Sequence, residues 1–136
     1  MRARGIGEQI ERLPQMPPCY ILISKNGQKP STGEMYRRVG SVGITKRPAT
    51  ELVAKGIAEG NLSDICRGIY NVFIPACDEV PIEDMEMLCS TAACGVGLSG
   101  SGPSVFGIYE NEADVVAAAE KLKTAGKTAY ICRPCE

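Results

Sequence analysis

The stretch GVGLSGSGPSVFGIY, residues 95–109, decides most of the fold because it contains two short apolar segments separated by a turn. Residues 95–98 and 104–109 have the length and the apolar, β-branched or aromatic content of strands. Between them, SGSGP supplies the small residues and the proline that tight turns require. The stretch therefore predicts two strands joined by the loop 99–103.

The residues after this hairpin predict a helix and a last strand. Asn111 is a typical N-cap residue, and Gly126 is a typical helix stop. One face of the predicted helix collects its apolar residues, Val115, Ala118, Ala119 and Leu122. Residues 128–132 form the expected final strand. A hairpin followed by a helix and a strand is the order of a split β-α-β arrangement.

The residues before the hairpin predict one strand and several helices. Residues 1–18 are expected to be irregular, and the apolar run CYILIS, residues 19–24, to be a buried strand. Ser31 and Glu34 have the spacing of a capping box that opens a short helix. A loop is expected over residues 40–48.

Three more helices are predicted in this part of the chain. Thr50 is expected to cap a helix that runs to residue 58 and stops at Gly60. Apolar residues at helical spacing predict a second helix over residues 62–73. A third is expected around residues 82–89, with Glu83 and Asp84 in its first turn. The fold class expected is α+β, a single domain over residues 1–136 with a four-stranded, mostly antiparallel sheet and helices on one face.

Composition excludes several classes of function. The chain has 136 residues, 15 basic and 16 acidic side chains, and a net charge of -1, so it lacks the basic surplus of a nucleic-acid-binding protein. Histidine is absent, which excludes Ser-His-Asp and Cys-His catalysis within this chain. No apolar run is long enough for a membrane span, and residues 1–14 do not resemble a secretory signal. We therefore expect a cytoplasmic protein that binds neither nucleic acid nor membrane.

The seven cysteines leave a second interpretation open. An odd number favours free, reduced thiols over a disulfide framework. Cys132 and Cys135 form a C-x-x-C pair, which a redox or metal site also uses, and Cys89 with Cys94 would complete a metal site if the fold brought the pairs together. Buried thiols acting as small apolar side chains are the simpler interpretation, and no metal site is predicted.

The loop 99–103 is the best candidate for chemistry. Gly95, Gly97 and Gly100 fit the G-x-G-x-x-G pattern, but a strand follows instead of the helix that a dinucleotide site needs. No Gly-Lys-Ser/Thr closes the stretch, so it is not a Walker A loop. Its glycines and hydroxyls could still form a backbone nest for an anion. A tight hairpin that simply requires small residues is the alternative.

Four motifs resemble the C-terminal lobe of the GHMP small-molecule kinases, over nearly the whole chain. LSGSGPSVFGIY, residues 98–109, resembles their third signature motif. Residues 4–8 (RGIGE) resemble the strand that enters that lobe, and residues 20–24 followed by PSTGEMY, residues 30–36, resemble a strand and helix start. Residues 62–73, with Tyr70 and Asn71, resemble a further helix, although Ile74 stands near the place of a usual acid. The branch with the closest motifs is the one of isoprenoid biosynthesis.

The resemblance implies a fold and half of a mechanism. It implies a lobe related to ferredoxin-like folds, whose loop faces the cleft and braces the phosphate-binding loop of a complete enzyme that uses ATP and Mg²⁺. The residues that match this loop are Ser99, Gly100, Ser101, Gly102, Pro103 and Ser104. Tyr36 matches an aromatic residue that stacks on the base of a diphosphocytidyl substrate, with Thr32 beside it as a polar contact. A half-buried structural tyrosine is the alternative for Tyr36.

The family's catalytic Asp, its catalytic Lys and its phosphate-binding loop belong to an N-terminal lobe that these residues do not match. We therefore expect no catalytic residue in this chain, no cofactor bound to it, and no kinase activity for the chain alone. The partner expected is the missing lobe, or a second copy of the chain through the face that the lobe would cover. A non-enzymatic ligand-binding or dimerising α+β module is the alternative function.

Overall fold

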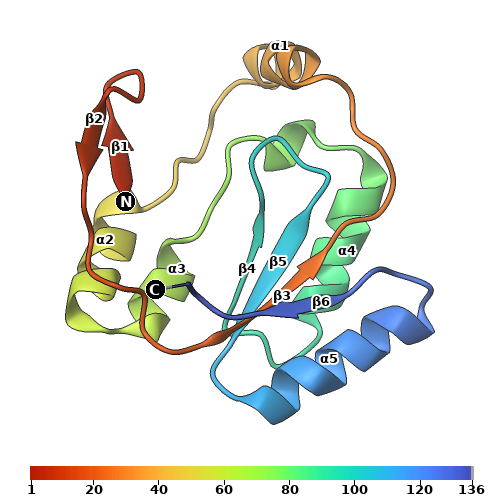
Figure 1. Cartoon of the computed structure of the whole chain (residues 1–136). Helices are drawn as coiled ribbons and strands as arrows, with labels where there is room; N and C mark the ends of the chain where they lie inside the picture. The colour runs from red at the N-terminus through yellow and green to blue at the C-terminus, as the bar shows by residue number, and fades with distance from the viewer. Residues whose placement is uncertain (136) are drawn as a thin grey trace.

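The centre of the computed structural model, which describes residues 1–135, is a four-stranded sheet in the order β4-β5-β3-β6 (Figure 1). Every neighbouring pair is antiparallel. The strands are β3 (Tyr20–Ser24), β4 (Gly95–Leu98), β5 (Val105–Tyr109) and β6 (Tyr130–Cys132). Because β3 lies between β5 and β6, which α5 connects, the split β-α-β arrangement is confirmed.

One face of the sheet carries the main core. Helices α4 (Glu79–Cys89) and α5 (Glu112–Thr124) cover this face. The fully buried side chains there come from both layers and include Leu22, Leu88, Val105, Tyr109 and Leu122. The Tyr109 hydroxyl lies 2.8 Å from the Thr91 hydroxyl, which satisfies a polar group inside the core.

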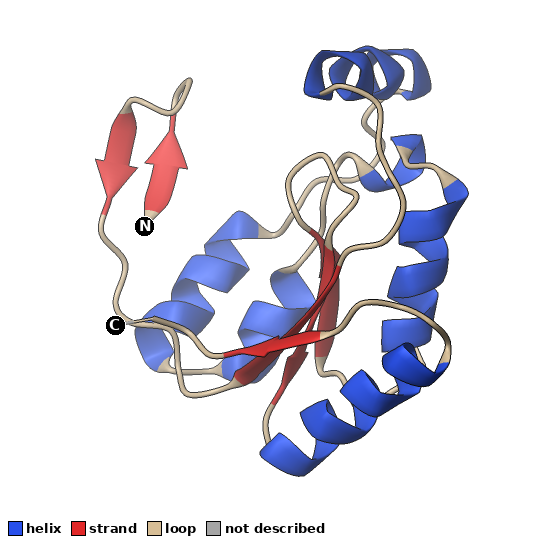
Figure 2. Cartoon of the chain, turned by 45° about the vertical axis from the view of Figure 1, so that its right-hand side comes forward, coloured by secondary structure: helices blue, strands red, loops and turns tan. Residues whose placement is uncertain are grey.

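A smaller cluster lies on the opposite face. Helix α3 (Leu62–Gly68) contacts β4 there and packs against α2 (Thr50–Glu59). Cys66 of α3 meets Cys19 and Ile108 in this cluster. Figure 2 shows the sheet nearly edge-on, with α4 and α5 on one side and α2 and α3 on the other. The α+β class with an antiparallel four-stranded sheet is confirmed, but the helices are not confined to one face as expected, because α2 and α3 lie on the other.

Local signals placed several elements correctly. The Asn111 side chain accepts from the Asp114 N–H at 3.0 Å, and all four predicted inward residues of α5 are buried. Gly126 has φ +73, the left-handed conformation that a glycine stop permits. Ser31 caps α1 (Thr32–Val42) by accepting from the Glu34 N–H at 3.2 Å. Glu34 does not complete the capping box, because its carboxylate pairs with Arg37 instead.

Other expectations were wrong near the ends of elements. Residues 1–18 are not irregular throughout, because β1 (Arg2–Arg4) and β2 (Gln9–Glu11) form a hairpin that stands apart from the main sheet (Figure 1). Helix α1 continues to Val42, past the start of the predicted loop. Ala49, not Thr50, is the N-cap position of α2, although Gly60 ends that helix with φ +67 as expected.

The helix predicted over residues 62–73 stops at Gly68. A Cβ at Gly68 would lie 2.5 Å from the Val53 Cγ2, so the glycine permits the close α2–α3 contact. Asn71 then forms a turn, and the short helix η1 (Ile74–Ala76) leads into α4. Because α4 begins at Glu79, Asp84 lies in its middle and not in its first turn. None of the helices in the described part of the chain is long and apolar enough to cross a bilayer.

Candidate functional site

The glycine-rich loop between β4 and β5 is closed by its own backbone. The Ser99 N–H donates to the Ser104 carbonyl at 2.8 Å, and the Gly102 N–H donates to the Ser99 carbonyl at 2.9 Å. Gly100 and Gly102 have φ +56 and +79, which side chains other than glycine rarely adopt. Within residues 1–135 the N–H groups of Gly100 and Ser101 donate to no acceptor. These two adjacent donors make the loop suited to an anion.

The Asn71 side chain fixes the glycine-rich loop by hydrogen bonds to its backbone. Its Nδ2 donates to the Leu98 carbonyl at 2.9 Å and to the Gly100 carbonyl at 2.7 Å. Its Oδ1 accepts from the Phe73 N–H at 2.9 Å. The helical spacing of residues 62–73 predicted Asn71 within a helix, whereas α3 ends at Gly68 and Asn71 lies in the turn that follows.

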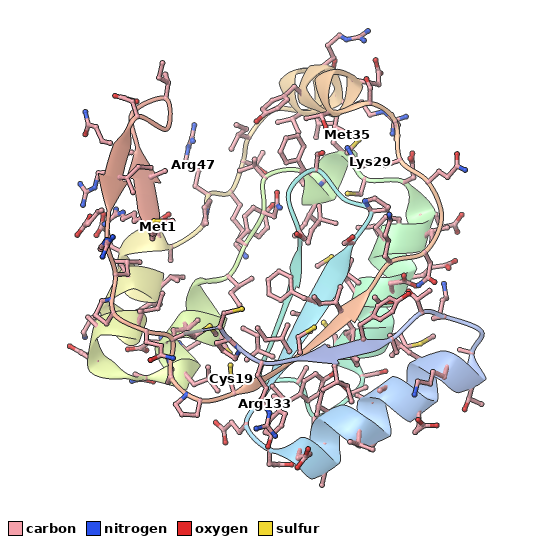
Figure 3. The ribbon with its side chains drawn as sticks, viewed as in Figure 1. Met1, Cys19, Lys29, Met35, Arg47 and Arg133 are labelled. Atoms are coloured by element: carbon pink, nitrogen blue, oxygen red, sulfur yellow. The ribbon has the colours of Figure 1, made fainter. Side chains whose placement is uncertain are left out.

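Lys29 joins the glycine-rich loop to the start of α1. Its Nζ donates to the Ser101 Oγ at 2.8 Å and to the Thr32 Oγ1 at 3.1 Å, and the two hydroxyls are 3.4 Å apart. Figure 3 shows Lys29 beside α1. Lys29 therefore brings together Thr32 and Ser101, which were predicted from separate motifs. The sequence motifs did not include this lysine. Its only sequence signal is its place directly before the PSTGEMY motif.

The loop that carries Lys29 is anchored by a buried charge. Asp84 of α4 is 1% exposed, and its carboxylate pairs with the Lys127 Nζ at 2.8 Å. The same carboxylate accepts from the Asn26 Nδ2 at 2.6 Å, and the Asn26 Oδ1 accepts from the Thr128 N–H at 2.9 Å. The hydrogen bond to Asp84 raises the pKa of Lys127 above its ordinary value of 10.5. This network fixes residues 24–26, from which the chain reaches Lys29.

Tyr36 is the exposed aromatic residue of the candidate site. Its side chain is 65% exposed and packs edge-on against Phe73, with ring centroids 5.0 Å apart and ring planes at 77°. Phe73 in turn neighbours Asn71, which holds the glycine-rich loop. The ring is thus supported on one side and open to solvent over most of its area, which is what stacking on a base requires.

The thiols do not gather into a second site. All seven cysteines are free, and within residues 1–135 no three Cys, Asp, Glu or His side chains lie where they could hold a metal ion. Cys66 and Cys94 approach with their Sγ atoms 3.4 Å apart. Burial, together with the neighbouring Cys94 thiol, raises the pKa of Cys66 to about 12. A thiol with so high a pKa is a poor nucleophile at neutral pH.

The predicted loop residues differ in their access to solvent. Ser99 and Gly100 are exposed, Ser101, Gly102 and Ser104 are half-buried, and Pro103 is buried. Among the described residues, those at the loop offer one ammonium group, several hydroxyls and free backbone donors. The arrangement is therefore suited to bind and position an anionic ligand.

Comparison with known proteins gives a consistent family. The model of the family described as "GHMP kinases C terminal" matches residues 52–128. The 4-diphosphocytidyl-2-C-methyl-D-erythritol kinase of Caldicellulosiruptor bescii is 33% identical over 97% of this chain and 47% of its own length. The kinase of the same name from Acetivibrio thermocellus is 35% identical over 92% of this chain and 45% of its own. This chain thus spans about half the length of these relatives.

Solved structures agree with this match. A crystal structure of 4-(cytidine 5'-diphospho)-2C-methyl-D-erythritol kinase has a TM-score of 0.72 and 25% identity, covering 96% of this chain and 48% of that chain. A homoserine kinase from Cytophaga hutchinsonii has a TM-score of 0.67 at 15% identity, covering 93% of this chain and 44% of that one, which shows a shared fold alone.

Proposed function

This chain belongs to the GHMP kinases, as their C-terminal region, and on that premise we propose that it is the substrate-binding lobe of an ATP-dependent kinase of isoprenoid biosynthesis. The complete kinase would transfer the γ-phosphate of ATP to the C2 hydroxyl of 4-diphosphocytidyl-2-C-methyl-D-erythritol. The observation that carries the proposal is the contact between Thr32 and Ser101 through Lys29, beside the exposed ring of Tyr36. It joins two separate family motifs in one polar site.

In the proposed mechanism this lobe positions substrate and does no chemistry. The Tyr36 ring stacks on the cytosine base, and the Thr32 hydroxyl gives a polar contact next to it. The loop from Ser99 to Ser104 faces the transferred phosphate with the free N–H groups of Gly100 and Ser101. Phosphoryl transfer depends mainly on positioning and charge stabilisation, so a lobe of this kind contributes to both without a catalytic base.

Magnesium does not fit the residues present here. Metal ions that assist phosphoryl transfer are held by carboxylates, and among the described residues no carboxylate takes part in the contacts between Lys29, Thr32 and Ser101. The proposal therefore assigns Mg²⁺, the catalytic Asp and Lys, and the phosphate-cradling loop to the other half of the complete kinase. The 136-residue chain alone is expected to have no kinase activity.

Cytidine binding tests the role of Tyr36. We expect cytidine to shift the backbone amides around Tyr36 in an NMR titration, and Tyr36→Ala to weaken binding by about 5- to 100-fold, the range that loss of base stacking produces. Tyr130→Ala is the matched control, since Tyr130 is 60% exposed on β6, outside the site. Equal cytidine affinity in both variants would contradict the stacking role.

A further inference from the structure

We propose that Lys29 is a phosphate-binding residue, which together with the Ser101 and Thr32 hydroxyls holds the diphosphate group of a nucleotide ligand. The identity of that nucleotide rests on the proposed function, whereas the anion site itself rests on the geometry of these three side chains. None of the motifs that resemble the GHMP kinases includes Lys29, which lies one residue before PSTGEMY.

The charge of Lys29 has no acidic partner in the structure. Among the ion pairs within residues 1–135, none includes Lys29, and its ammonium bonds only to two neutral hydroxyls. An ammonium group has three N–H donors, so one donor and the full positive charge stay available. The side chain is also half-buried and held in one place. A fixed, uncompensated cation of this kind is what an anion site needs.

The groups around Lys29 add donors and no negative charge. The Ser101 and Thr32 hydroxyls accept from Lys29, and one of them can donate to the other at 3.4 Å, which leaves one hydroxyl hydrogen to donate elsewhere. The free N–H groups of Gly100 and Ser101 lie in the same loop. Lysine binds phosphate as a point charge, without the planar geometry that favours arginine and carboxylate pairs. A phosphate, which presents several oxygen acceptors in different directions, suits this mixed set of donors best.

The position of Tyr36 indicates how much of a nucleotide the site can take. Thr32 and Tyr36 are four residues apart in α1 and therefore lie on the same face of the helix. A base stacked on Tyr36 and a phosphate bound at Lys29 can thus belong to one nucleoside diphosphate. The phosphates of ATP have the same chemistry, so the two nucleotides must be separated by experiment.

Titration of the 136-residue chain with four probes tests this inference. Amide NMR spectra are recorded with pyrophosphate, cytidine, cytidine 5'-diphosphate and ATP, each up to about 10 mM, well above a millimolar Kd. We expect pyrophosphate and cytidine 5'-diphosphate to shift the Thr32 and Ser101 amides, and cytidine alone to leave the Ser101 amide in place. Tighter binding of cytidine 5'-diphosphate than of ATP identifies the substrate diphosphate; the reverse order assigns the site to the phosphates of ATP.

Two variants separate binding from folding. Lys29→Met is expected to weaken pyrophosphate and cytidine 5'-diphosphate binding by about 10- to 100-fold, as loss of a charge-assisted contact does. Lys25→Met removes the same charge from an exposed position four residues earlier and is expected to bind like the wild type. Lys29→Arg keeps the charge and is expected to retain most of the affinity.

Different results would contradict the phosphate site at Lys29 and the cytidine-specific function. Undiminished phosphate binding in Lys29→Met, or no shift at Thr32 and Ser101 with pyrophosphate, would overturn the phosphate site even if cytidine binds at Tyr36. Pyrophosphate binding that depends on Lys29, combined with no cytidine response at Tyr36, would keep the phosphate site and contradict the cytidine-specific function.

Discussion

Replacing Lys127 with methionine removes the cation that faces the buried carboxylate of Asp84. The Asp84 side chain has no exposed surface, whereas the Lys127 side chain is 20% exposed. Once the ammonium is gone, Asn26 still donates to the carboxylate at 2.6 Å, but the negative charge is no longer balanced. Breaking a buried ion pair from one side costs about 3–5 kcal/mol. Because Lys127 is partly exposed, we expect a loss of about 3 kcal/mol.

Urea denaturation followed by circular dichroism measures this loss. In a chain of this size, about 3 kcal/mol corresponds to a Tm lower by roughly 10 °C. Lys123→Met is the matched control, since Lys123 pairs with Glu120 at 2.9 Å on the surface, where both side chains are more than half exposed. We expect that control to lose about 0.5 kcal/mol or less. A Lys127→Met loss no greater than that of Lys123→Met would refute the reasoning.

The pH dependence of the same pair gives a second check. Since the hydrogen bond to Asp84 raises the pKa of Lys127 in the folded state, the stabilisation is complete below the ordinary value of 10.5. It is lost as the pH rises through the raised pKa, where the ammonium deprotonates. The stability difference between wild type and Lys127→Met should therefore stay constant up to about pH 10 and decrease above it. A difference that grows with alkaline pH would contradict the assignment.

Two further predictions concern packing and thiol chemistry. A Cβ at Gly97 would lie 2.6 Å from the Phe106 Cζ, so Gly97→Ala should lower the free energy of unfolding by about 1–3 kcal/mol in thermal unfolding. Gly40 lies in α1 with open space around it, so Gly40→Ala should raise the free energy of unfolding by about 0.5–1 kcal/mol. With its pKa raised to about 12, Cys66 should be alkylated by iodoacetamide at a rate that rises about tenfold per pH unit to pH 10, while the exposed Cys89 reacts first. Equal stability of the two glycine variants, or a rate plateau for Cys66 below pH 10, would argue against these readings of the structure.

Sequence reasoning succeeded where the signal was local. The Asn111 cap, the four inward residues of α5 and the stop at Gly126 depend on neighbours within one helix, so they could be predicted together. The split β-α-β order followed because the hairpin, α5 and β6 are consecutive in the chain. The loop 99–103 was found for the same reason, since its glycines and proline are a signal in themselves.

Sequence reasoning failed where tertiary contacts decide the outcome. α3 ends at Gly68, where a side chain would meet Val53 of α2, and helical periodicity contains no information on that contact. Asp84 was predicted in a first helical turn, and its pairing with Lys127, far along the chain, appears only in the fold. Lys29 belongs to no motif, and only folding brings it to Ser101, 72 positions later in the sequence. The two motifs of the site were therefore predictable from the sequence, whereas the contact that Lys29 makes between them was not.

The most direct measurement of the central claim is the activity of a hybrid kinase. Its N-terminal half would come from the Caldicellulosiruptor bescii relative, and this chain would replace the matching C-terminal half. We predict ATP- and Mg²⁺-dependent phosphorylation of 4-diphosphocytidyl-2-C-methyl-D-erythritol by the hybrid, and none by this chain alone. A folded hybrid that binds ATP yet transfers no phosphate to this substrate, or that prefers homoserine, would contradict the account.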